Sequence, residues 1–315
     1  VQYVPLEFWN RLLHDPDGIY PFASQLGKNH FLTFGEALLL PSPFDDSIEH
    51  KIVEYLGSTE TPGLNSMLGF PVYFDINNVI AKGQPTAQLE YRLNKFMEIF
   101  PDPFVIPNFV DNHDTARFLA AGHGAAFRQA LATVFTIPGI PIIYQGTEQG
   151  LPETRMAMYA GGHRNADGSF DPESDYYRYI QELTALRREH KVLTRGDLKV
   201  IAADSAGPGI FAYRRDYEGR TVYVVLNTAD HSIIVKDLAV GTAPRAAMNM
   251  LFGVGFDADI VADGGGNLDL VLPARAVLVL EEGHTVATTD DRPAGMIGFA
   301  PLDTTGPFTT DFVLS

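Results

Sequence analysis

The stretch Phe104-Val105-Ile106-Pro107-Asn108-Phe109-Val110, followed at once by Asp111-Asn112-His113-Asp114, decides the fold. A short apolar run that ends in a polar segment is typical of a buried strand in a parallel sheet. Three similar runs, at residues 30–34, 70–74 and 140–144, are also predicted to be strands. Amphipathic stretches alternate with these runs and predict helices over residues 5–13, 87–100, 125–135 and 176–190. The alternation indicates βα units around a parallel sheet.

The pattern changes after Arg195 to strands of alternating polarity. Residues 210–214 and 221–226 are predicted strands, joined through a turn that contains Glu218-Gly219. A linker rich in Thr, Asp and Pro follows the last predicted strand. We therefore expect three parts: an α/β part over residues 1–193, an antiparallel β-domain over residues 194–282, and a linker with the start of a further module over residues 283–315.

Composition excludes several classes of partner and site. The 23 Lys and Arg residues against 39 Asp and Glu residues leave a net charge of −16, which disfavours nucleic acid and anionic membranes. The chain has no Cys, which excludes disulfides, thiolate metal sites and Cys nucleophiles. Its nine His residues show no zinc-binding spacing, and no phosphate-binding Gly loop follows a strand. We predict no metal site and no cofactor in this chain.

Two carboxylates stand just past predicted strands. Glu36 follows the first strand and Asp114 follows the third. In parallel α/β folds such positions meet at one edge of the sheet, where a pair of carboxyl groups can perform acid/base chemistry on a glycosidic bond. The alternative interpretation is structural: Glu36 is a solvated loop acid, and Asp111 or Asp114 caps a helix over residues 115–119.

Several segments together resemble the α-amylase family, glycoside hydrolase family 13. Residues 109–114 are similar to the family's fourth conserved region, and Phe34-Gly35-Glu36 is similar to its third. Residues 69–74 resemble the sixth barrel strand, and residues 139–149 resemble the segment at the eighth. The order of these segments fits over about residues 1–280. The resemblance implies the second half of a (β/α)8 TIM barrel, strands five to eight, followed by an antiparallel β-sandwich domain.

The resemblance implies a role for each of four residues. Glu36 would be the general acid/base, Asp114 would stabilise the transition state by holding sugar hydroxyls, and His113 would donate to the same sugar. Arg155 matches the arginine of the family's Asp-Pro-x-Asn-Arg segment and would donate to a sugar hydroxyl, although a surface ion pair is its alternative role. Leu151 stands where that segment has its Asp, which implies a different fit on the donor side.

The family's nucleophile is absent from this chain. Retaining α-glycosidases need a second carboxylate about 5–5.5 Å from the acid/base, and in this family it is an Asp in a Gly-x-Arg-x-Asp segment. No such segment occurs here, whereas Val1-Gln2-Tyr3-Val4 resembles the stretch that follows it. Gln2 and Tyr3 would bind substrate in place of the Lys and His that many members have on the acceptor side. We expect a complementary N-terminal polypeptide, or another segment of one precursor, to supply strands one to four and any structural calcium site.

These features predict a retaining hydrolase or transglycosylase that acts on α-glucans of the starch or maltooligosaccharide type. The alternatives are a noncatalytic carbohydrate-binding relative and a structural half of an inactive enzyme. Because the substrate is a polymer, we expect a secreted protein, extracellular or periplasmic.

Overall fold

The computed structural model describes residue 1 and residues 3–283, so Gln2 and nearly all of the expected linker at residues 283–315 lie outside the described residues. Two pairs of short parallel strands form the centre of the first part: β1 (Phe34–Gly35) with β2 (Ser66–Met67), and β3 (Pro107–Asn108) with β4 (Ile140–Pro141). The amide of Gly69 donates to the carbonyl of Pro107 at 2.9 Å and so joins the two pairs. The strands therefore follow one another from β1 to β4 in chain order.

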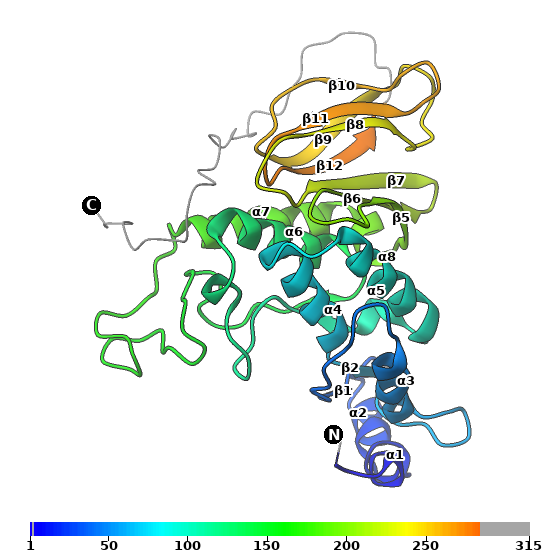
Figure 1. The fold of residues 1–315 in the computed structure, drawn as a ribbon. Coiled ribbons are helices and arrows are strands. Elements are labelled where there is room, and N and C mark those ends of the chain that lie inside the picture. The colour runs from blue at the N-terminus through cyan, green and yellow to red at the C-terminus, as the bar shows by residue number, and fades with distance from the viewer. Residues whose placement is uncertain (2, 284–315) are drawn as a thin grey trace.

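Helices flank these strands, and Figure 1 shows helices beside β1 and β2. The predicted helices are confirmed as α1 (Leu6–His14), α5 (Thr86–Ile99), α6 (Gly124–Thr136) and α7 (Asp175–Glu189). The apolar positions of α5 and α6 lie in one large core, with Leu89, Leu93 and Phe96 of α5 and Phe127 and Leu131 of α6 fully buried. The remaining helical elements are short: α2 (Ile19–Gln25), α3 (Ser47–Val53), η1 (Glu54–Leu56), α4 (Phe70–Ile76), η2 (Asn77–Ala81), η3 (Pro103–Val105), η4 (Phe118–Ala120) and α8 (Lys191–Arg195).

The predicted strand at residues 70–74 is wrong. These residues form the start of α4, and the strand lies just before them at Ser66–Met67. A continuous apolar run fits a buried helix as well as a buried strand, and Pro71 in the first turn favours the helix because its φ is already helical. The predicted strand at residues 104–110 also shortens, since it begins inside the 3-10 turn η3 and only Pro107–Asn108 pair as β3.

The second part is antiparallel. Six strands form one sheet in the order β10-β9-β12-β7-β6-β5, and β8 pairs with β11 in a second sheet. Tyr223, Val225 and Leu278 of the larger sheet share a buried core with Leu268 and Leu270 of β11. The bounds are β5 (Asp197–Ala203), β6 (Ile210–Tyr217), β7 (Arg220–Asn227), β8 (Ile233–Leu238), β9 (Ala247–Val254), β10 (Ile260–Val261), β11 (Leu268–Leu272) and β12 (Val277–Glu282). In Figure 1 the strands β5 to β7 lie beside the helices α5 to α8.

Two buried arginines, one from the β-domain and one from α7, bind backbone carbonyls around the end of α6. Arg215 of β6 donates through Nε to the carbonyl of Gly196 at 3.1 Å, and Arg187 of α7 donates to the carbonyls of Phe135 at 2.7 Å and Gly139 at 2.6 Å. Carbonyls at the end of a helix carry partial negative charge, which suits a guanidinium. Burial nevertheless lowers the pKa of Arg187 to about 10 and that of Arg215 to about 9. These contacts fix the connection that leads from α6 into β4.

None of the helices in the described part of the chain is long and apolar enough to cross a membrane.

Candidate active site

The carboxyl ends of the short parallel strands bring the predicted residues to one edge. Glu36 follows β1, the segment of residues 111–114 follows β3, and Tyr144 follows β4. The carboxyl ends of parallel strands share an edge, which is where ligands bind in α/β folds. The Glu36 side chain is exposed and makes no hydrogen bond or ion pair with the described residues, while its backbone carbonyl accepts from the amino group of Val1 at 2.7 Å.

Asp114, His113 and Arg155 form one cluster at this edge. Arg155 Nη2 lies 3.0 Å from Asp114 Oδ1, and its Nε donates to the carbonyl of His113 at 2.8 Å. The other carboxylate oxygen, Oδ2, lies 3.2 Å from His113 Nε2. The amide of Asp114 donates to Asn112 Oδ1 at 2.8 Å, which fixes the turn. The Asp114 side chain remains 29% exposed, so a hydroxyl can still reach it.

Asp111 has the structural role that the alternative interpretation described. Its Oδ1 accepts from the amide of Phe118 at 2.7 Å, at the start of η4, and its Oδ2 accepts from Thr147 Oγ1 at 3.0 Å. Burial raises the pKa of Asp111, while the Phe118 amide and the charge of Arg117 oppose that shift. Asp111 thus caps the turn at Phe118, whereas Asp114 is more exposed.

The sequence interpretation missed Arg117. Its side chain is fully buried, and it donates to Gln145 O at 2.7 Å, to Glu153 O at 2.8 Å and to Asp111 Oδ2 at 3.4 Å. The guanidinium lies 4.6 Å from the centre of the Tyr144 ring, within reach of a cation–π interaction. An arginine between Ala116 and Phe118, just past a polar motif, was the available signal.

A second buried arginine, also missed, holds the loop that follows Glu36. Arg92 of α5 donates through Nε to Asp75 Oδ2 at 2.7 Å and also contacts the carboxylate of Glu49. It further donates to the backbone carbonyls of Ser42 and Asp45, each at 3.1 Å. Burial raises the pKa of both carboxyl groups, and Arg92 opposes the shift. The cluster fixes the path of residues 42–49.

Two further predicted residues, Gln2 and Tyr3, lie at the N-terminal end of the chain. The predicted acceptor-side residue Tyr3 is 90% exposed, and Gln2 is not among the described residues. Tyr73 is buried, with its ring stacked 5.2 Å from that of Phe109. Trp9 packs against the core.

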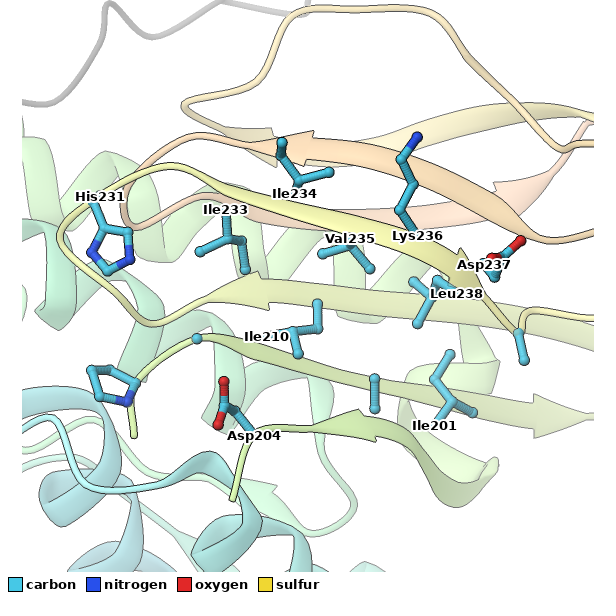
Figure 2. Close-up of a pocket in the computed structure, with 14 residues that line it drawn as sticks. Ile201, Asp204, Ile210, His231, Ile233, Ile234, Val235, Lys236, Asp237 and Leu238 are labelled. Carbon is cyan, nitrogen blue, oxygen red and sulfur yellow. The ribbon is translucent and has the colours of Figure 1, made fainter. Parts of the chain in front are cut away.

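A cavity of about 490 Å³ lies away from this edge, in the β-domain. Figure 2 shows Ile233 and Val235 of β8 pointing toward Ile210 of β6 across it. Aliphatic side chains dominate its lining, which contains no Phe, Tyr or Trp ring, so the cavity is a seam between the two sheets. Across residues 1 and 3–283, no group of three or more His, Asp or Glu side chains is placed to hold a metal ion.

Comparison with known proteins finds relatives over part of this chain. Residues 74–166 match the model of the alpha amylase catalytic domain. The Beta/alpha-amylase of Paenibacillus polymyxa is 31% identical over 197 residues, which are 59% of this chain and 15% of that protein. The Cyclomaltodextrinase of Thermoanaerobacter pseudethanolicus is 31% identical over 138 residues, which are 42% of this chain and 22% of that protein. The chain thus spans less than a quarter of either relative.

Among solved structures, an Anoxybacillus alpha-amylase superposes with a TM-score of 0.67 and 21% identity, over 91% of this chain and 58% of that one. This likeness shows a shared fold that extends through both parts of the chain. The resemblance to the α-amylase family is confirmed over part of the chain by the match of residues 74–166 to the alpha amylase catalytic domain and by these relatives.

Proposed function

We propose that this chain is the acid/base-bearing part of a retaining α-glucan hydrolase or transglycosylase. The observation that carries the proposal is the Asp114 carboxylate, held by His113 and Arg155 at the edge where Glu36 is exposed. The names of the relatives, an amylase and a cyclomaltodextrinase, support an α-glucan as the substrate.

The chemistry proceeds in two steps. In the first, Glu36 protonates the glycosidic oxygen while a carboxylate nucleophile attacks the anomeric carbon and the leaving sugar departs. In the second, Glu36 removes a proton from water or from a sugar hydroxyl, which displaces the nucleophile and restores the acid. Asp114 accepts from sugar hydroxyls, and His113 and Arg155 hold that carboxylate and donate to the same sugar.

The nucleophile comes from outside this chain, because no Gly-x-Arg-x-Asp segment occurs in the 315 residues. We propose that β1 to β4 are strands five to eight of a (β/α)8 barrel and that the two antiparallel sheets form its β-sandwich domain. A complementary polypeptide, or another segment of one precursor, supplies strands one to four together with the nucleophile.

The surface of the described residues supports this closure. β1 pairs only with β2, and β4 only with β3, so each outer strand has an open edge within the described part of the chain. Ten of the sixteen exposed large hydrophobic side chains lie between Tyr3 and Phe44, on the β1 side. A cavity of about 590 Å³ lies along α1, and one of about 460 Å³ lies beside Ile143 near β4. These exposed apolar side chains support the proposal that another body covers this side.

The first test is denaturing mass spectrometry of the natively purified protein, in search of a companion that carries Gly-x-Arg-x-Asp. We expect one to be found, and we expect the pair to hydrolyse or transfer α-glucans. A folded, soluble monomer of this chain that turns over starch by itself would refute the external nucleophile.

The second test compares Glu36→Gln with Glu60→Gln, a matched change of an exposed loop acid, in the active preparation. Glu36→Gln should abolish turnover and keep glucan binding, because the amide is far too weak an acid to protonate the leaving oxygen. Glu60→Gln should change neither. If the paired wild-type protein binds glucans without turnover, the noncatalytic alternative is correct.

A further inference from the structure

The buried guanidinium of Arg117 lies where three segments of the candidate site meet. Its side chain has no exposed surface, and its donors point in different directions. Nη1 faces Asp111 Oδ2 at 3.4 Å and Thr147 Oγ1 at 3.5 Å, Nη2 donates to Gln145 O at 2.7 Å, and Nε donates to Glu153 O at 2.8 Å. One side chain therefore joins the segments at residues 111–118, 144–147 and 151–155.

Each of these segments carries part of the site. The first carries His113 and Asp114, and the third carries Arg155, which contacts both. The second carries Tyr144, whose ring lies on the Arg117 guanidinium and 6.2 Å from the ring of His113. The relative positions of the acid, the imidazole and the outer arginine therefore depend on Arg117.

The contacts at the surface are too weak to set these positions alone. Arg155 is 66% exposed and His113 is 58% exposed, so their pairs with Asp114 are screened by water. Hydrogen bonds from a buried guanidinium are stronger, and its planar fork fixes their directions. The buried contacts of Arg117 therefore fix the geometry at Asp114.

We propose that Arg117 is a positioning residue for the sugar-binding cluster of His113, Asp114 and Arg155, an inference that rests on the proposed function of that cluster. Lysine cannot replace it, because a single ammonium group cannot span carbonyls on two segments and a carboxylate on a third. A displacement of a binding group by about 1 Å can lower the rate of the catalysed reaction by up to about 100-fold.

The test measures acarbose binding by calorimetry on the full chain, with any companion that copurifies, and the ring resonances of His113 by NMR. The variants are Arg117→Lys and Thr147→Val, which removes one hydroxyl of the network without changing its shape. Arg215→Lys is the matched control, a buried arginine that also binds backbone carbonyls but lies at the β-domain junction.

We expect Arg117→Lys to weaken acarbose binding at least about tenfold and to shift the His113 ring resonances. Thr147→Val should also weaken acarbose binding and shift the His113 resonances, but by less. If Arg117→Lys does not fold, the result for Thr147→Val decides whether the inference holds. Arg215→Lys should lower the melting temperature and leave binding and the His113 resonances unchanged. The inference is overturned if a folded Arg117→Lys or Thr147→Val leaves both readouts unchanged, or if Arg215→Lys changes them equally.

If the wild-type protein binds no acarbose, the proposed function fails. The His113 resonances of the same variants then still decide whether Arg117 sets the cluster's geometry.

Discussion

Replacing Arg92 by Met tests whether the buried charge cluster anchors the loop after Glu36. The change removes a guanidinium with no exposed surface that contacts Asp75 at 2.7 Å and Glu49. Two like-charged carboxyl groups would remain in the core without a counter-ion, and breaking a buried pair in this way typically costs about 3–5 kcal/mol. The melting temperature should fall by about 6–20 °C.

The assay is urea and thermal unfolding followed by the fluorescence of Trp9, the single tryptophan, which packs against the same core. Lys95→Met is the matched control on the same helix, because Lys95 pairs with Asp46 and Glu98 in partly exposed positions and should change stability little. A loss below about 1 kcal/mol for Arg92→Met would refute the reasoning.

Three further predictions concern single contacts. Burial raises the pKa of Glu49, so the contribution of this carboxyl group to stability is full below about pH 4.3 and is lost as the pH rises through the raised pKa. Glu49→Gln should therefore reduce the loss of stability with rising pH, measured as urea midpoints at successive pH values. An unchanged slope of midpoint against pH would contradict this prediction. Tyr213→Phe removes a hydroxyl 2.5 Å from Thr136 Oγ1 and should cost about 1 kcal/mol in urea unfolding, whereas a gain in stability would show that the contact is not favourable. Gly219 has φ +80° in the two-residue turn between β6 and β7, so Gly219→Ala should cost about 1–2 kcal/mol by the same assay, and a neutral result would show that the turn relaxes.

The parts of the fold that the sequence predicted are those with strong local signals. The structure confirms the helices predicted from long amphipathic stretches, as α1, α5, α6 and α7. It also confirms the strands predicted from alternating polarity and their turn, as β6 and β7. The prediction of a strand at residues 70–74 was wrong because a segment that is apolar on every side has no periodicity that distinguishes a helix from a strand.

The supporting contacts of the site could not be predicted, because they depend on residues far apart in the chain. Asp111 and Asp114 look alike in sequence, and only the fold brings Thr147 onto the first and Arg155 onto the second. Arg117 has the same property, since its carbonyl partners follow β4 rather than β3. Asp111 is buried and Asp114 is partly exposed, and this difference in burial arises only in the folded chain.

The two arginines that bind the carbonyls at the end of α6 have a consequence for cooperativity. Arg215 belongs to the β-domain, yet its guanidinium contacts the backbone of Thr136 and Leu193, on the barrel side of the expected boundary at residues 193 and 194. A truncation at that boundary would leave these carbonyls buried without donors or exposed to water, and would uncover the side of α5 and α8 that β6 contacts. The two parts are therefore expected to melt in one transition, so the topological boundary is not an energetic one.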